Sequence, residues 1–167
     1  GWLGITMPEE YGGSGLGVAE AAVMMNTVAA CGAMTAASSI HINMFGPHPI
    51  LVFGTEEQKR KWIPPLIKGD DKVSFGVTEP NVGLDTTNIT TFAEKVDGGY
   101  IVNGRKIWNS TAQEATRIML LARTQKREDN KDPTKGITIF YTEFDRSKIE
   151  VQVIHKMGRK AVDSNMI

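Results

Sequence analysis

The sequence predicts an α+β protein in which a helical N-terminal domain is followed by an antiparallel β-barrel domain. Up to about residue 70, apolar residues recur at three- and four-residue spacing, which is typical of helices that bury one face. Beyond that point, short runs of period two alternate with glycine turns, which is typical of a small barrel or sandwich. We place the boundary at Gly69-Asp70-Asp71, so the predicted domains are 1–70 and 71–167.

The composition is that of an ordinary globular protein and excludes several partners. The 167 residues are 41% hydrophobic and 23% charged, which is enough to bury a core. Nineteen basic and nineteen acidic residues cancel, so no long-range field favours nucleic acid or an anionic membrane. No apolar run approaches the roughly 18 residues of a membrane span, and the start lacks the basic region of a signal peptide. We expect neither a membrane protein nor a secreted one.

Residues that bind metals or undergo redox chemistry are sparse. The single cysteine, Cys31, excludes an internal disulfide and a CxxC site, and we interpret it as a buried small apolar residue. His41 and His48 have no Cys, Asp or Glu within four positions, which favours polar packing over metal ligation. The sequence therefore predicts no metal site.

The first half is expected to hold helices after an irregular, glycine-rich lead-in over residues 1–17. The first helix runs from Val18 to about Ala37 and presents a narrow face of small residues, which permits close packing. A second helical stretch, 39–53, is interrupted at 46–49 because its two prolines cannot continue a helix without a break. We interpret four methionines here as core filling rather than as an adaptable binding surface: Met24, Met25, Met34 and Met44.

A capping box opens the last helix of this half. Thr55 supplies a hydroxyl at the N-cap, and Gln58 follows three residues later, ahead of the basic run Lys59-Arg60-Lys61. Pro64-Pro65 is expected to end the helix, because proline lacks the backbone N–H that a helix interior needs.

The second half reads as an antiparallel meander of short strands. Asp97-Gly98-Gly99 and Asn103-Gly104 are tight-turn sequences that would join neighbouring strands. A charged segment, Gln125 to Lys135, is expected to be a solvated, mobile loop. The predicted strands are 73–77, 90–95, 100–103, 105–108, 117–124, 136–142 and 149–154.

The stretch Phe75 to Asp85, FGVTEPNVGLD, stands out at the start of this half. A strand runs into a shaped loop in which proline removes a backbone donor and glycine permits a close approach. Such a loop presents backbone N–H groups and the Thr78 hydroxyl to something outside the chain. The alternative is an ordinary turn between two strands.

Five segments, in order and suitably spaced, resemble the acyl-CoA dehydrogenase family. They are the entry segment 1–15, the helix with its Pro-Pro-Leu stretch over 54–68, the motif over 75–85, the Gly99–Trp108 hairpin and Lys156-Met157-Gly158-Arg159. The resemblance implies a helical N-terminal domain and a middle β-barrel domain, followed by a C-terminal four-helix domain. The chain opens on Gly1-Trp2 and stops inside a predicted strand. We therefore expect a partial chain, in which the C-terminal domain is absent.

The resemblance also implies FAD as the cofactor, held by two motifs. In the first, the backbone of Val77 and Thr78 and the Thr78 hydroxyl would donate to the isoalloxazine ring. In the second, Trp108 would pack against the ring and Ser110 would place a hydroxyl near N5; the alternative for Trp108 is an aromatic plug of the barrel. The implied cofactor-binding residues are Phe75, Gly76, Val77, Thr78, Gly83, Leu84, Trp108, Asn109 and Ser110.

Leu84 departs from the family pattern. The family usually has a serine here whose hydroxyl reaches the pyrophosphate or the acyl-CoA, so contact at this point must rely on backbone N–H groups. Thr86 or Thr87 is the substitute that the sequence offers. The departure leaves the flavin interpretation intact and the acyl-CoA contact open.

The implied reaction is α,β-dehydrogenation of an acyl-CoA thioester to the trans-2-enoyl-CoA, which needs a carboxylate base. Glu79, Glu94 and Glu114 are the glutamates near the motifs, and none matches a catalytic position of the family. We therefore assign no catalytic residue to this chain and expect the base beyond Ile167. The chain alone is expected to be inactive.

The resemblance further implies an acyl-CoA substrate, an electron-transfer flavoprotein as partner and a homotetramer at full length. It implies a cytoplasmic location, or the mitochondrial matrix in a eukaryote. Two alternatives stay open: an acyl-CoA oxidase or flavin monooxygenase on the same scaffold, and a binding relative that has lost its flavin.

Overall fold

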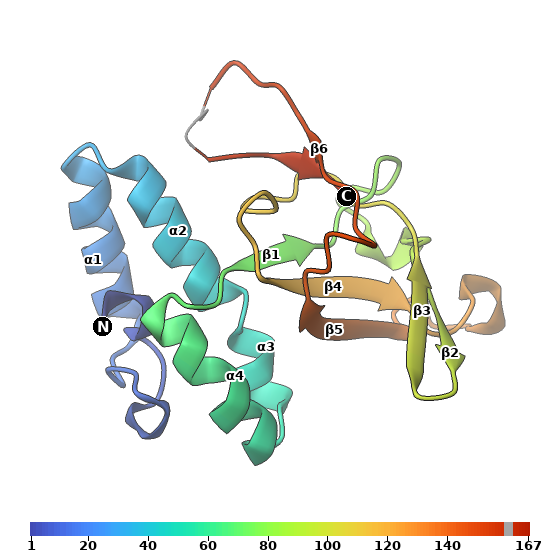
Figure 1. The fold of residues 1–167 in the computed structure, drawn as a ribbon, viewed down its shortest axis with the longest axis horizontal. Helices are drawn as coiled ribbons and strands as arrows, with labels where there is room; N and C mark the ends of the chain where they lie inside the picture. The colour runs from blue at the N-terminus through green and yellow to red at the C-terminus, as the bar shows by residue number, and fades with distance from the viewer. Residues whose placement is uncertain (159–161) are drawn as a thin grey trace.

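The computed structural model describes residues 1–158 and 162–167 and confirms the α+β class. Four helices form one side of the molecule and the strands form the other (Figure 1). The helices are α1 Val18–Ala30, α2 Met34–Phe45, α3 His48–Phe53 and α4 Glu56–Lys68, with short 3-10 turns η1 Trp2–Gly4 and η2 Glu9–Tyr11 before them. The strands are β1 Val73–Gly76, β2 Phe92–Val96, β3 Gly99–Asn103, β4 Arg117–Arg123, β5 Ile137–Glu143, β6 Gln152–Val153 and β7 Asn165–Met166, with 3-10 turns η3 Thr86–Asn88 and η4 Arg127–Asp129.

The helix predicted over 18–37 is two helices. Gly32 adopts a φ of +81°, a left-handed conformation that glycine reaches without steric cost, and the chain reverses there between α1 and α2. Cys31 lies at this reversal and is exposed, so its interpretation as a buried residue is wrong. Of the methionines, Met24 is buried as expected, whereas Met34 at the start of α2 is exposed.

Helix α4 begins as predicted but does not end as predicted. The Thr55 hydroxyl accepts from Gln58 N at 3.2 Å and the Gln58 side chain accepts from Thr55 N at 2.9 Å, which completes the capping box. Pro64 and Pro65 lie inside the helix, which continues to Lys68 and ends at a left-handed Gly69. The carbonyls that lose a helical donor belong to exposed residues, where water can serve as the donor.

The strands form a mixed sheet, so the antiparallel barrel is wrong. The five-stranded sheet is built around β4, which pairs in parallel with β1, antiparallel with β5 and in parallel with β2 at Phe92–Arg123. β3 joins β2 as an antiparallel hairpin, and β6 and β7 form a separate two-stranded sheet. No closed barrel occurs among the described residues. The β2–β3 hairpin and the segment after it connect the end of β1 to the start of β4. This connection allows β4 to lie beside β1 and run in the same direction.

One of the two predicted tight turns forms and the other, at Asn103-Gly104, does not: β3 ends at Asn103 and the chain runs on without a turn. The hairpin turns at Asp97-Gly98, with a φ of +78° at Gly98. The segment 105–108 is not a strand; it makes isolated backbone pairings, such as that of Lys106 with Ile167 at 2.7 and 2.9 Å. Of the predicted strand 149–154, only Gln152–Val153 forms. The family-like segment ending in Arg159 lies partly outside the described residues.

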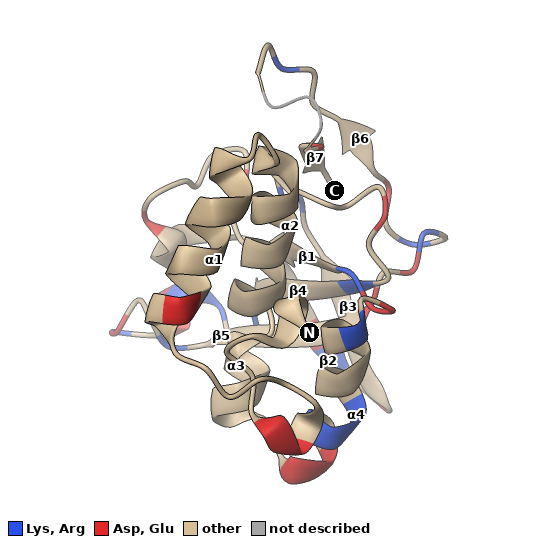
Figure 2. Cartoon of the chain, turned by 90° about the vertical axis from the view of Figure 1, so that its left-hand side faces the viewer, with Lys and Arg blue, Asp and Glu red and all other residues tan. Residues whose placement is uncertain are grey.

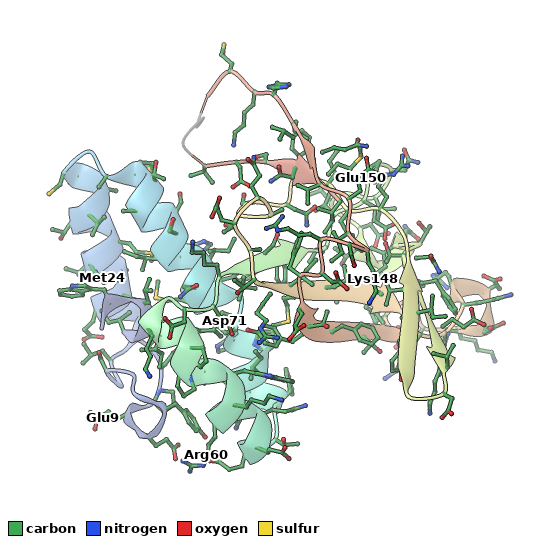
Figure 3. All side chains as sticks on the ribbon, in the orientation of Figure 1. Glu9, Met24, Arg60, Asp71, Lys148 and Glu150 are labelled. Atoms are coloured by element: carbon green, nitrogen blue, oxygen red, sulfur yellow. The ribbon has the colours of Figure 1, made fainter. Side chains whose placement is uncertain are left out.

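The helices and the sheet share one core. Ile63 and Leu66 of α4 pack with Val73 of β1 and Met119 of β4. At the edge of this contact, Arg117 Nε lies 3.2 Å from an Asp71 carboxylate oxygen, at the junction labelled in Figure 3. Figure 2 shows that α1 and α2, by contrast, carry almost no charge. Within the described part of the chain, no helix is long and apolar enough to cross a membrane.

Replacing Thr55 with alanine removes the N-cap acceptor of α4, which packs on the sheet through Leu66. We expect a loss of about 1 kcal/mol in the free energy of unfolding, measured by urea denaturation followed by circular dichroism. Thr35→Ala, an exposed change in α2, is the control and should stay within about 0.5 kcal/mol of the parent. Equal losses in both variants would refute the capping role.

Candidate functional site

The two predicted motifs lie side by side in space. Phe75 and Gly76 end β1, Val77 and Thr78 follow at once, and the Ile107 N–H donates to the Thr78 carbonyl at 2.8 Å. This bond brings the residues after 107 against the end of β1. Nearly 30 residues separate the motifs in the sequence, so only the fold joins them.

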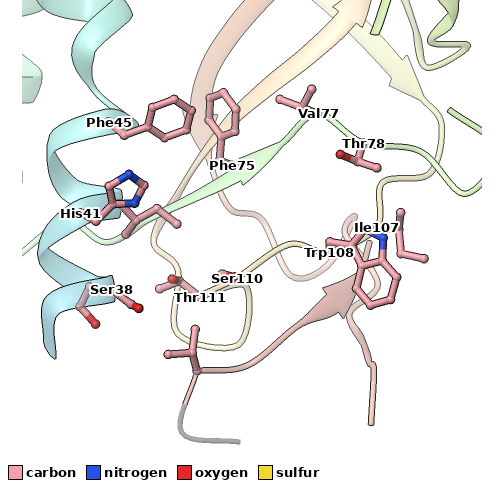
Figure 4. Close-up of a pocket in the computed structure, with 13 residues that line it drawn as sticks. Ser38, His41, Phe45, Phe75, Val77, Thr78, Ile107, Trp108, Ser110 and Thr111 are labelled. Carbon is pink, nitrogen blue, oxygen red and sulfur yellow. The ribbon is translucent and has the colours of Figure 1, made fainter. Parts of the chain in front are cut away.

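Together the motifs form one side of a pocket of about 310 Å³ (Figure 4). Trp108 is 58% exposed and lines the pocket beside the Thr78 side chain. Neither the Thr78 hydroxyl nor the Ser110 hydroxyl has a hydrogen-bond partner among the described residues. The motif residues that line the pocket are Phe75, Val77, Thr78, Trp108 and Ser110.

Helix α2 forms the opposite side of the pocket, which the sequence does not predict. His41 stacks on Phe45 with ring centroids 5.8 Å apart, and Phe45 meets Phe75 edge to face at 4.8 Å. Ser38, His41 and Phe45 are three and four residues apart, so they share one helix face. That spacing was visible in the sequence, but nothing there indicated that this face meets β1.

The remaining predicted site residues do not line the pocket. Gly76 is buried in β1, where an added Cβ would lie 3.0 Å from Leu120. Asn109 is fully buried and its side-chain amide donates to the Phe75 carbonyl at 3.0 Å, so it ties the motifs together. Gly83 and Leu84 lie on the exposed loop that leads to η3.

The second motif is held in a strained conformation. Trp108 and Thr111 adopt φ values of 66° and 68°, in a region that costs non-glycine residues on the order of 1–3 kcal/mol. Asn109 exchanges backbone hydrogen bonds with Asn165 at 2.9 and 3.1 Å, and the Thr111 N–H donates to Asp163 at 2.7 Å. These bonds fix the turn and leave the Trp108 and Ser110 side chains at the pocket.

A buried ion pair fastens the first motif. Lys106 Nζ lies 2.9 Å from a Glu79 carboxylate oxygen and donates to the Val77 carbonyl at 2.9 Å. The Lys106 and Glu79 side chains are 2% and 4% exposed. Glu79 also accepts from the Thr90 N–H and hydroxyl, both at 2.7 Å, and from the Thr91 N–H at 2.8 Å. These bonds agree with the expectation that Glu79 is not a catalytic base.

The two charges of this pair respond to burial in opposite ways. Burial raises the pKa of Glu79, but the hydrogen bonds from Thr91 and Thr90 outweigh it and bring the pKa to about 2. Burial also lowers the pKa of Lys106, and Glu79 opposes that shift. Glu79 is therefore an ionised, fully engaged carboxylate.

Comparison with known proteins assigns the chain to a family. The description "Acyl-CoA dehydrogenase, N-terminal domain" matches residues 1–70, and "Acyl-CoA dehydrogenase, middle domain" matches residues 74–167. The chain belongs to the acyl-CoA dehydrogenase family. Members of this family depend on FAD.

Individual relatives support this assignment to the acyl-CoA dehydrogenase family. Mitochondrial isovaleryl-CoA dehydrogenase of Arabidopsis thaliana is 36% identical over 163 residues, which are 96% of this chain and 39% of that protein. Butyryl-CoA dehydrogenase of Megasphaera elsdenii has a TM-score of 0.85 at 31% identity, over 99% of this chain and 44% of that one. The prolyl acyl carrier protein oxidase AnaB has a TM-score of 0.84 at 29% identity, over 99% and 44%. The chain thus spans about two fifths of the relatives it matches.

The pocket fits a flavin of this family by the chemistry of its walls. Trp108 offers an exposed aromatic face, and Thr78 and Ser110 offer hydroxyls that nothing in the described part of the chain engages. A strained turn that holds an aromatic side chain open to solvent is typical of a ligand site. No group of three His, Cys, Asp or Glu residues suited to a metal occurs among the described residues.

The loop with the family departure is shaped by Asp85, which caps η3. Its carboxylate accepts from the Thr87 N–H at 3.1 Å and from the Thr87 hydroxyl at 2.5 Å, and these bonds lower its pKa. The Thr87 hydroxyl proton is thus engaged, which leaves Thr86 as the freer of the two predicted substitutes. Leu84 is fully exposed, and nothing in the structure explains it.

The acid stability of the chain should depend on Glu79. Its pKa is about 2 in the fold against 4.5 in the unfolded chain, so its contribution is complete above pH 4.5 and is lost as the pH falls toward about 2. Glu79→Gln should flatten the dependence of unfolding free energy on pH within this window, measured by urea denaturation at several pH values. The exposed Glu94→Gln is the control. An unchanged pH dependence in Glu79→Gln would contradict the assignment.

Proposed function

We propose that this chain supplies the flavin-binding parts of an enzyme that oxidises an acyl-CoA thioester to its trans-2-enoyl-CoA with FAD. The observation that carries the proposal is the convergence of the two motifs on one pocket through the Ile107–Thr78 bond. The family match supports it, because the matched description covers both halves of the chain. The reaction itself needs parts beyond the two fifths of the relatives that this chain spans.

The pocket residues have separable tasks in this proposal. Phe75, Val77 and Trp108 supply apolar and aromatic walls that would hold the ring and exclude water. The Thr78 and Ser110 hydroxyls would donate hydrogen bonds to the ring edge. When bound, FAD accepts the two electrons and the β-hydrogen that leave the acyl chain. Fixed donors at the edge that gains charge are each worth on the order of 3 kcal/mol, by analogy with oxyanion-hole groups.

The acid–base chemistry is proposed to lie outside this chain. Glu79 is buried and paired with Lys106, so it cannot reach a substrate carbon. Glu94 lies on the exposed side of the hairpin, and Glu114 lies 3.8 Å from Lys72; neither lines the pocket. We therefore keep the assignment of no catalytic residue here and expect a carboxylate base from residues after Ile167.

The partners follow from the family. We propose an acyl-CoA substrate, an electron-transfer flavoprotein as electron acceptor and a homotetramer for the complete enzyme. A location in the cytoplasm, or in the mitochondrial matrix of a eukaryote, belongs to the same proposal; the relative from Arabidopsis thaliana is mitochondrial.

A second candidate keeps the site and changes the electron acceptor to oxygen. The similarity to the prolyl acyl carrier protein oxidase AnaB supports it, and also admits a carrier other than coenzyme A. Reoxidation of the reduced flavoprotein by air within seconds would favour the oxidase, whereas reoxidation only by an electron-transfer flavoprotein would favour the dehydrogenase. Protein purified without flavin would favour a binding relative.

Trp108→Ala should weaken FAD binding about fivefold, because an aromatic contact of this kind is worth about 1 kcal/mol. The measurement is a titration that follows quenching of flavin fluorescence. Trp2→Ala removes an exposed tryptophan that does not line the pocket and should leave the affinity unchanged. Equal affinities for both variants would contradict the role of Trp108.

Residues 1–167, loaded with FAD, should not reduce a dye with an acyl-CoA, because none of the described residues that line the pocket is a carboxylate. A full-length isovaleryl-CoA dehydrogenase assayed beside the chain is the positive control. Dye reduction at a comparable rate would show that the base lies within these residues.

A further inference from the structure

The Lys106–Glu79 pair contacts a peptide group at the proposed flavin site, in addition to fastening the fold. Lys106 Nζ donates to the Val77 carbonyl at 2.9 Å. That carbonyl and the Thr78 N–H belong to one peptide unit. Thr78 lines the pocket, and no acceptor for its N–H occurs within residues 1–158 and 162–167. A buried cation thus lies at one end of an amide whose other end is available to a ligand.

A positive charge beside the carbonyl oxygen of an amide increases the hydrogen-bond donor strength of the N–H of the same amide. Hydrogen bonds in series polarise one another, and each member is strengthened by its neighbour. An ammonium donor polarises an amide more than a neutral donor does, and the low local dielectric preserves the effect. The Thr78 N–H is therefore a stronger donor than an ordinary backbone amide.

The counter-charge is shared among several other donors. Glu79 shares its negative charge among Lys106, the two donors of Thr90 and the Thr91 N–H. Its pKa is held at about 2, so it stays ionised and cannot take the ammonium proton at physiological pH. The peptide unit thus experiences the cation directly, and the anion only beyond it.

We propose that Lys106 is a positioning residue that acts through the Val77–Thr78 peptide unit, strengthening the Thr78 N–H as a donor to the flavin edge and raising the flavin's affinity for electrons. The inference rests on the proposed function, since it needs a flavin in this pocket. The Ile107 N–H, which donates to the Thr78 carbonyl at 2.8 Å, fixes the orientation of the next peptide unit and so aims the donor.

The test measures the midpoint potential of the bound flavin in the whole protein that carries this chain. The double variant Lys106→Met/Glu79→Gln removes both charges and keeps similar side-chain volumes, so no buried charge is left unpaired. We expect it to retain flavin and to bind reduced flavin about tenfold more weakly relative to oxidised flavin, which is a fall of about 30 mV for a two-electron couple. Spectroelectrochemical titration reports this value without an activity assay.

Two further variants separate electrostatic positioning from structural support. Lys106→Arg keeps the positive charge and the N–H donors. Its midpoint potential should differ from that of the parent by no more than about a third of the difference seen in the double variant. Lys148→Met/Asp145→Asn neutralises an exposed ion pair of 3.0 Å by the same chemistry and should leave the potential unchanged. If the double variant fails to fold, Lys106→Arg decides alone, because a lowered potential there contradicts the proposal and an unchanged one supports it.

The outcomes distinguish failure of the proposed function from failure of the inference about Lys106. A parent protein that binds no flavin sinks the proposed function, and the inference with it. A yellow parent whose potential equals that of the flavin-loaded double variant overturns the inference and leaves the proposed function standing. A double variant and Lys106→Arg with equal shifts would also overturn it, because loss of packing would then explain both.

Discussion

The buried Lys106–Glu79 ion pair is the contact on which the site depends. Glu79 lies just after β1, and Lys106 precedes the second motif by two residues, so the pair joins segments that the β2–β3 hairpin separates. Burying two charges costs several kcal/mol each unless other hydrogen bonds complete them, and both residues are completed here by backbone and threonine groups. Such a pair contributes less to total stability than to a unique register, because any slip would leave a charge unpaired in the interior.

The strain of the second motif follows from this register. With Lys106 fixed between Val77 and Ile167, the chain has only a few residues in which to turn from β1 toward β7. Trp108 and Thr111 take up the turn with positive φ, and their cost is offset by the Asn109–Asn165 pairing and by Asp163. A glycine at either place would relax the backbone but would supply no side chain. The strained backbone at Trp108 therefore occurs where an exposed tryptophan side chain lines the pocket.

The sequence predicts features that depend on neighbouring residues, and it does not predict features that depend on contacts between residues far apart in the chain. The Thr55 capping box and the Asp97-Gly98 turn are decided within a few residues, and both are present. The parallel pairing of β1 with β4 is decided some 40 residues away, so period-two patterning could not distinguish it from an antiparallel meander. The continuation of α4 through Pro64 was missed for a related reason. Its packing on the sheet outweighs the propensity of proline.

The same distinction holds at the pocket. Five of the nine residues that the sequence predicts for the site line the pocket, and their assignment to a flavin stays a prediction. The α2 face could not be predicted, because serine, histidine and phenylalanine at helical spacing carry no chemical signature. The roles of the motif residues also needed the fold. Asn109 reads as part of a cofactor motif, yet its amide is committed to the Phe75 carbonyl.

The charges around the pocket agree with a separation between the residues that would bind the flavin and the carboxylate that would act as base. None of the described residues that line the pocket is Asp, Glu, Lys or Arg. The buried cation Lys106 donates to the carbonyl of Val77, a residue that lines the pocket, and its carboxylate partner Glu79 is also buried. In the proposed function, a pocket of this kind tunes an electron acceptor without a carboxylate beside it, because a negative charge there would oppose the charge that the ring gains. Placing the base on another part of the protein lets each be optimised alone, which is the physical reason to expect it outside these residues.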